Sequence, residues 1–137
     1  MAVLLDPSFL VAAADAADLN HRAAAAWLAG AREPLYVATT ALVEVDTLLQ
    51  RELGLTATLA VLEAVAAGSL TPVGPTAEDL RRAADLLRRA TEHRPRLADA
   101  LLVALAERLA ITRVATFDRR PLAIFRPYQR RALEFVP

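Results

Sequence analysis

The feature that most constrains the fold is an alternation of short apolar runs with longer segments of helical periodicity. The runs that we predict to be strands are Val3–Leu5, Leu35–Ala38, Leu70–Val73, Arg113–Phe117 and Leu133–Val136. The segments between them that we predict to be helices start at about Phe9 and, further on, cover about Leu19–Leu28, Thr40–Leu53, Thr56–Ala66, Thr76–Glu92 and Leu97–Ala110. Strands separated by helices are typical of a parallel sheet that is covered on both faces. We therefore expect one α/β domain over residues 1–137, a three-layer α/β/α sandwich around a mostly parallel sheet of four to five strands.

The composition excludes several kinds of chemistry. The chain has no cysteine, which rules out disulfides, thiolate zinc sites and cysteine nucleophiles. All 16 basic residues are arginine, so neither a Schiff base nor a phosphate-loop lysine is available. Sixteen acidic residues balance them. Because the net charge is zero, a surface that binds nucleic acid would have to be a local patch.

The hydropathy pattern indicates neither a membrane segment nor a signal peptide. No uncharged stretch is long enough to cross a bilayer as a helix. The N-terminus has no basic region, and Asp6 interrupts its first apolar run. We expect a cytoplasmic protein without a membrane partner.

Two acidic residues come directly after predicted strands. Asp6 follows the first strand, and Asp118 follows the strand that ends at Phe117. Ligands of open parallel sheets bind beyond the carboxyl ends of the strands, which is where both acids would lie. Taken singly, each acid is also compatible with an ordinary turn or helix cap.

A third acid, Asp99, occupies the first turn of a strongly apolar helix. At 3.6 residues per turn it shares a face with Val103, Ala106 and Ala110. A carboxylate on a buried face needs a cation beside it, or it takes up a proton. The alternative is an exposed acid that complements the helix dipole.

Two further acids, Glu44 and Asp46, flank the apolar stripe of the helix that starts near Thr40. Residues two apart are separated by roughly 200° on a helix, so the two acids lie on opposite sides of Val45. We expect one of them to reach the site, and periodicity leaves open which one.

Together these acids and their neighbours resemble a known family. The segments that carry the resemblance are Val3–Ser8, Thr39–Asp46, Leu97–Leu101 and Ala115–Arg120. In order and spacing they resemble the PIN-domain nucleases, and among them the VapC-type toxins of bacterial toxin–antitoxin pairs, over essentially the whole chain. The resemblance implies a single PIN domain whose site acids are Asp6, Glu44, Asp99 and Asp118, and so favours Glu44 over Asp46. It also implies that the hydroxyls of Ser8 and Thr116 support the site, while Pro7 and Pro121 depart from the usual pattern.

The resemblance also implies an activity and partners. It implies an endoribonuclease toxin whose carboxylates bind one or two Mg²⁺ ions, with Mn²⁺ as a possible substitute. Hard divalent ions prefer oxygen ligands and can activate water for phosphodiester hydrolysis, so the acids fit the chemistry. The implied partners are RNA, a cognate VapB-type antitoxin and a second copy in a homodimer.

The arginines fall into two groups. Arg119, Arg120 and Arg126 follow Asp118 and are candidates for RNA-phosphate contacts, the alternative being a solvated tail. A second group, on the helix that starts at Thr76, is predicted to be an exposed face of i,i+4 ion pairs. These pairs are Glu78–Arg82, Arg81–Asp85 and Asp85–Arg89.

Two other functions are compatible with parts of this pattern. A receiver-like signalling domain also binds Mg²⁺ and a phosphoryl group with acids at strand ends, but it relies on a lysine that this chain lacks. A catalytically decayed PIN interaction module would be expected to have lost site acids, and all four are present.

Overall fold

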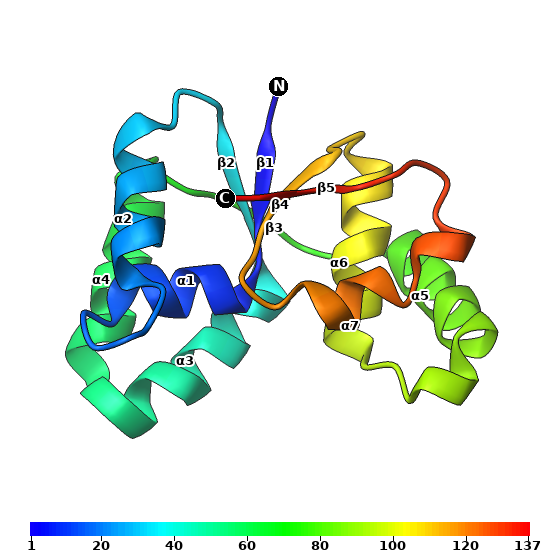
Figure 1. Cartoon of the computed structure of the whole chain (residues 1–137), viewed down its shortest axis with the longest axis horizontal. Coiled ribbons are helices and arrows are strands. Elements are labelled where there is room, and N and C mark those ends of the chain that lie inside the picture. Colours follow the sequence, from blue (N-terminus) through cyan, green and yellow to red (C-terminus); the bar gives the residue numbers. More distant parts are fainter.

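A computed structural model describes residues 1–137 as a five-stranded sheet between two layers of helices (Figure 1). The strands are β1 (Val3–Leu5), β2 (Leu35–Ala38), β3 (Thr71–Val73), β4 (Arg113–Ala115) and β5 (Glu134–Val136). All neighbouring strands pair in parallel, in the order β3-β2-β1-β4-β5. The expected α/β/α sandwich with a parallel sheet is confirmed.

The helices form two separate layers (Figure 1). The first layer contains α1 (Pro7–Ala14), α2 (His21–Gly30), α3 (Thr39–Leu53) and α4 (Leu55–Ala66). The second contains α5 (Ala77–Arg89), α6 (Leu97–Arg108) and α7 (Arg119–Ala123), with short 3₁₀ turns at Thr91–His93 and Arg126–Tyr128. The chain adds β2 and β3 on one side of β1 and then returns to add β4 on the other side. Because parallel crossovers are right-handed, this reversal places the later helices on the opposite face of the sheet.

The core is formed by the central strands and the helices that cover them. All three residues of β1 are fully buried, as expected for the middle strand of a sheet covered on both faces. In α6 the residues from Ala100 to Ala106 are all buried, because this helix is enclosed by the sheet and by α5. No helix in the structure has the length and apolar character needed to cross a membrane.

The predicted element boundaries differ from the observed ones in ways that have local causes. Helix α1 starts at Pro7, before the predicted Phe9, because the Asp6 carboxylate caps it and proline suits the first helical turn. Strand β4 ends at Ala115 and not at Phe117, since the next two residues turn toward the start of α1. The five-residue helix α7 was not predicted, because one turn is too short to show periodicity.

Candidate functional site

The four predicted acids lie together beyond the carboxyl ends of β1 and β4. Asp6 follows β1, Glu44 lies in the second turn of α3, Asp99 lies in the first turn of α6, and Asp118 directly precedes α7. They line one open pocket of about 240 Å³, whose other lining residues include Ser8 and Arg96. The reversal of strand order at β1 creates the space for this pocket, as it does for ligand sites in other open parallel sheets.

Asp46, the alternative to Glu44, does not line this pocket. Its carboxylate accepts hydrogen bonds from Gln50 Nε2 at 2.7 Å and from Thr58 Oγ1 of α4 at 2.8 Å. These two bonds lower the pKa of Asp46. Asp46 therefore links α3 to α4, while Glu44 faces the other three acids.

A network of hydroxyl groups fixes the orientation of Asp6. Oδ2 of Asp6 accepts bonds from Ser8 Oγ at 2.6 Å, from the Ser8 backbone N–H at 3.2 Å and from Thr116 Oγ1 at 2.8 Å. Thr116 is fully buried, and its Oγ1 also accepts the backbone N–H of Asp118 at 3.0 Å. The two hydroxyls thus connect the start of α1 to the loop that carries Asp118.

The second oxygen of Asp6 is left for another partner. All three bonds to this carboxylate use Oδ2, and none uses Oδ1. The structure contains no buried side-chain oxygen or nitrogen without a hydrogen bond, so Oδ1 must be reached by solvent in the pocket. Burial raises the pKa of Asp6, the hydroxyl bonds partly offset that rise, and the charge of Glu44 adds to it.

Asp99 is the acid of this pocket with the most strongly raised pKa. Burial is the main cause that raises its pKa to about 6 from a usual value of 3.8. The negative charge of Asp6 raises this pKa further, and Glu44 and Asp118 contribute in the same direction, whereas Arg96 lowers it. A cation placed among these carboxylates would relieve the repulsion.

Arg96 is the one basic residue that lines the pocket, and it was not predicted from the sequence. It directly precedes α6, and its Nη2 donates to Glu44 Oε1 at 3.2 Å. The Arg96 side chain is 66% exposed, against 27% for Glu44, so it lies at the mouth of the pocket. Its position one turn before Asp99 was the available signal in the sequence.

The residues of the pocket fit a hard divalent cation by their chemistry. As the side chains stand, no three acidic or histidine groups are placed to hold one metal ion together. Mg²⁺, however, usually keeps several waters and takes only one or two carboxylates from the protein, so a cage of three is not required. The pocket offers carboxylate oxygens and no histidine, which is the donor set of Mg²⁺ or Mn²⁺.

The three arginines predicted to contact RNA do not line this pocket. Arg119 Nη2 donates to the backbone oxygen of Pro137 at 2.7 Å. Arg120 and Arg126 are exposed and have no ion-pair partner. They lie on α7 and just after it, in the second helical layer.

Comparisons with known proteins agree with this arrangement. The model of the PIN domain family matches residues 3–126. Ribonuclease VapC26 of Mycobacterium tuberculosis is 31% identical over 125 residues, which cover 91% of this chain and 93% of that protein. The crystal structure of Mycobacterium tuberculosis VapC20, described as a sarcin–ricin loop cleaving toxin, matches with a TM-score of 0.82 and 25% identity over 88% of this chain and 93% of that one.

More distant structures share the fold. VapBC2 from Rickettsia felis, crystallised with a DNA fragment from its promoter, matches with a TM-score of 0.72 at 14% identity, and the match covers 100% of both chains. FitAcB from Neisseria gonorrhoeae matches with a TM-score of 0.67 at 19% identity over 98% of this chain and 96% of that one. The sandwich with its reversal at β1 is therefore shared at low sequence identity.

Proposed function

Because this chain belongs to the PIN-domain family, among its VapC-type members, we propose that it is an Mg²⁺-dependent endoribonuclease toxin, with Mn²⁺ as a possible substitute. The observation that carries the proposal is the pocket in which Asp6, Glu44, Asp99 and Asp118 face one another. Burial, and after it the charges of the neighbouring acids, raise the pKa of Asp99 to about 6, and a divalent cation in the pocket would stabilise the ionised form.

Within this pocket the four acids have different surroundings and therefore different proposed roles. Oδ1 of Asp6 and the carboxylate of Asp99 would hold the metal, because neither is bonded to a basic side chain and both acids are less exposed than Asp118. When bound, the metal would activate water and neutralise charge on the phosphate. Glu44 is bonded to Arg96 and Asp118 is exposed, so these two acids would complete the site or orient the attacking water.

Ser8 and Thr116 act as positioning residues. Their hydroxyls hold Oδ2 of Asp6, which keeps Oδ1 directed into the pocket. A site whose ligands are fixed in advance loses less free energy when the metal and substrate bind.

The proposed RNA contacts begin directly beside Asp118. Arg119, Arg120 and Arg126 are exposed, and planar guanidinium groups can bind two phosphate oxygens at once. Only Arg119 has a partner in the structure, the backbone oxygen of Pro137, which an incoming phosphate could replace.

We further propose that a cognate VapB-type antitoxin and a second copy of the chain bind its surface. Leucines on α4, among them Leu55, Leu59 and Leu62, are exposed to 57%, 46% and 46%. An open, almost entirely apolar pocket of about 380 Å³ lies beside them, between α1, α2 and α4. Apolar surface of this kind is typical of protein interfaces.

The test is cleavage of purified total RNA by the wild type, Asp6→Asn, Asp99→Asn and Glu44→Gln, each with Mg²⁺ or with EDTA. Asp46→Asn is the matched control, because it removes a carboxylate from α3 outside the pocket. We expect cleavage by the wild type and by Asp46→Asn in Mg²⁺ only, and a loss of cleavage in the other three variants. Equal cleavage by all the proteins, or cleavage that EDTA does not reduce, would refute the proposal.

A further inference from the structure

The charges of the chain are divided unequally between its two helical layers. Residues 1–73, which include α1 to α4, contain three arginines and eight acids. Residues 74–137, which include α5 to α7, contain thirteen arginines and eight acids. Although the chain as a whole is neutral, residues 1–73 carry a net charge of −5 and residues 74–137 carry a net charge of +5. Such a separation directs polyanions to one side of a molecule.

Many of the arginines in residues 74–137 have no acidic partner. Six of the thirteen arginines pair with acids, and Arg119 binds a backbone oxygen. The remaining six are exposed, and none has an ion pair or a side-chain hydrogen bond: Arg81, Arg88, Arg94, Arg120, Arg126 and Arg131. Their charges are available to a ligand.

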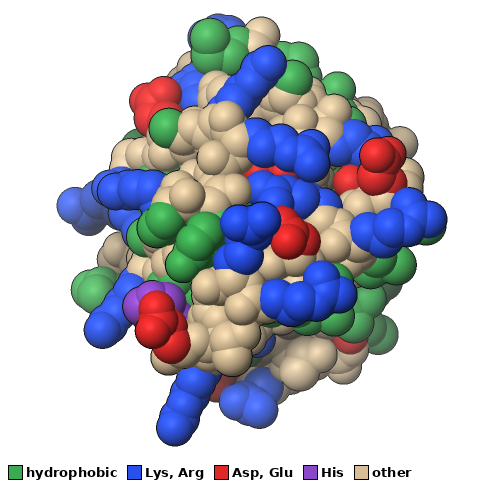
Figure 2. Space-filling view, turned by 90° about the vertical axis from the view of Figure 1, so that its right-hand side faces the viewer, with side chains coloured by type: hydrophobic (Ala, Val, Ile, Leu, Met, Phe, Trp, Pro, Cys, Tyr) green, Lys and Arg blue, Asp and Glu red, His purple; other side chains and the backbone are tan.

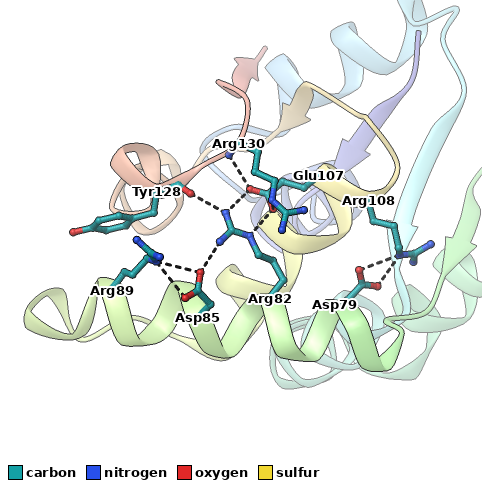
Figure 3. A network of polar contacts seen from close by, with 8 residues as sticks. All are labelled: Asp79, Arg82, Asp85, Arg89, Glu107, Arg108, Tyr128 and Arg130. Atoms are coloured by element: carbon teal, nitrogen blue, oxygen red, sulfur yellow. Dashed lines mark hydrogen bonds and ion pairs between the residues drawn. The ribbon is translucent and has the colours of Figure 1, made fainter.

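A buried ion network brings the C-terminal arginines beside α5 (Figure 3). Arg82 donates from Nε to Glu107 Oε2 at 2.7 Å and from Nη2 to Glu107 Oε1 at 2.9 Å, and both side chains are largely buried. Nη2 also donates to the backbone oxygen of Tyr128 at 2.7 Å, and the N–H of Arg130 donates to Glu107 at 3.1 Å. These bonds hold the segment from Tyr128 to Arg131 against α5 and α6.

An open groove of about 530 Å³ lies over this network, and eight of its nine lining residues are charged. Its deepest acid, Asp79, is bound by Arg108 at 2.9 Å, and Glu107 is bound by Arg82, so these two acids are neutralised. Arg81 and Arg130 lie at its exposed edge. Figure 2 views this side of the molecule and shows arginine side chains spread over the whole face, with fewer acidic groups among them.

A groove on the first-layer side of the site is more acidic: four acids and one arginine line it, whereas four acids and four arginines line the 530 Å³ groove. The first-layer groove has a volume of about 440 Å³ and shares Ser8 and Asp118 with the carboxylate pocket. Its other lining residues include Asp15, Asp18 and Glu52 beside a single arginine. A phosphate chain leaving the site in this direction would meet negative charge.

We propose that the RNA backbone runs from the carboxylate pocket across the α5–α6 side of the molecule, bound by the free arginines of this face, of which Arg81 lines the 530 Å³ groove. The inference rests on the proposed nuclease function and adds the path of the substrate. Arg81 and Arg88 are two helical turns apart, about 10 Å, so they contact separate phosphates and do not form a pocket for one anion. Contacts of this kind set affinity and position and carry no sequence information.

The test compares two triple variants that make the same change in charge. Arg81→Gln, Arg88→Gln and Arg131→Gln remove free arginines from the second layer. The control makes the same Arg→Gln change at Arg22, Arg32 and Arg51 of the first layer. These arginines are also exposed and outside any ion pair. Both triple variants also carry Asp99→Asn, and binding is measured in EDTA, so that RNA is bound and not cut. Circular dichroism checks that each protein is folded.

Binding of a fluorescein-labelled single-stranded polyuridine RNA is followed by anisotropy over a series of KCl concentrations. Each phosphate contact contributes about 0.7 to the slope of log affinity against log salt for single strands, so we expect the second-layer triple to lower that slope by about 2. The first-layer triple should leave it unchanged.

If the two triple variants lower the salt slope equally, the proposal is wrong, because the net charge of the protein and not the location of the arginines would then govern RNA binding. An unchanged slope in the second-layer triple would also overturn it. If that variant instead changes the mass measured by size-exclusion chromatography with light scattering, the face is a protein interface. The proposed function survives these outcomes as long as the wild type still cuts RNA in Mg²⁺, so the two failures can be told apart.

Discussion

Replacing Asp99 with asparagine should stabilise the metal-free protein, because the variant no longer buries a carboxylate charge close to three others. The pKa of Asp99 rises from 3.8 to about 6 on folding, mainly through burial and then through the charge of Asp6. At 1.36 kcal/mol per pKa unit this rise corresponds to about 3 kcal/mol. Since the side chain is only half-buried, solvent screening reduces the expected gain to about 1–2 kcal/mol.

The sign of this effect depends on pH. An acid whose pKa is raised in the folded state has no effect on stability at a pH below its unfolded pKa. As the pH rises from the unfolded pKa to the folded pKa, the free energy of unfolding falls, and above the folded pKa the loss is constant. The advantage of Asp99→Asn should therefore be small near pH 4, grow through pH 6 and be constant above about pH 7. Urea denaturation in EDTA at pH 4.5 and pH 8 measures it.

The matched control is Asp46→Asn, for which we expect the opposite sign. The pKa of Asp46 is lowered by hydrogen bonds from Gln50 and Thr58, so its loss should reduce stability at pH 8. If Asp99→Asn is no more stable than the wild type at pH 8, or if its gain is the same at both pH values, the repulsion argument is wrong. Added Mg²⁺ should narrow the difference by stabilising the wild type.

Three more substitutions test other parts of the structure. Arg96→Gln should strengthen binding of Mn²⁺ because it removes the guanidinium that competes for Glu44, and titration calorimetry measures the change. Thr116→Val should cost about 1–3 kcal/mol in urea denaturation, because the buried Oδ2 of Asp6 loses a hydrogen bond. Arg82→Met should cost about 3–5 kcal/mol in the same assay, because it leaves the charge of Glu107 buried without its partner.

Nearby residues serve as controls for these substitutions. Arg94→Gln removes an exposed charge from the loop before α6 and should leave Mn²⁺ affinity unchanged. Arg81→Met removes an exposed arginine next to Arg82 and should change stability little. Weaker Mn²⁺ binding by Arg96→Gln would mean that Arg96 supports the metal site and does not compete with the metal.

The fold could be predicted from the sequence because its main signals are local. Apolar runs of strand length, separated by helical periodicity, were enough to indicate the parallel sheet and its helical layers. The position of Asp6 followed from the end of a strand. The half-buried position of Asp99 followed from a helix face whose Val103 and Ala106 are buried.

Features that depend on how helices pack could not be predicted in this way. Periodicity placed Glu44 and Asp46 on opposite sides of α3, but which side faces the strand ends depends on the position of α4, where Thr58 binds Asp46. Of the pairs predicted on α5, Asp85–Arg89 is formed, whereas Glu78–Arg82 and Arg81–Asp85 are not. Arg82 bonds instead to Asp85 and, across the contact between α5 and α6, to Glu107, a partner 25 residues away in the sequence.

The position of β1 in the middle of the sheet has a consequence for protein synthesis. Asp6 and Glu44 belong to the first third of the chain, whereas Asp99 and Asp118 belong to the last. The layer of α1 to α4 is complete at residue 66, so a chain emerging from the ribosome exposes that layer before the pocket has all its acids. A growing chain therefore has no complete carboxylate pocket until the residues up to Asp118 have been made.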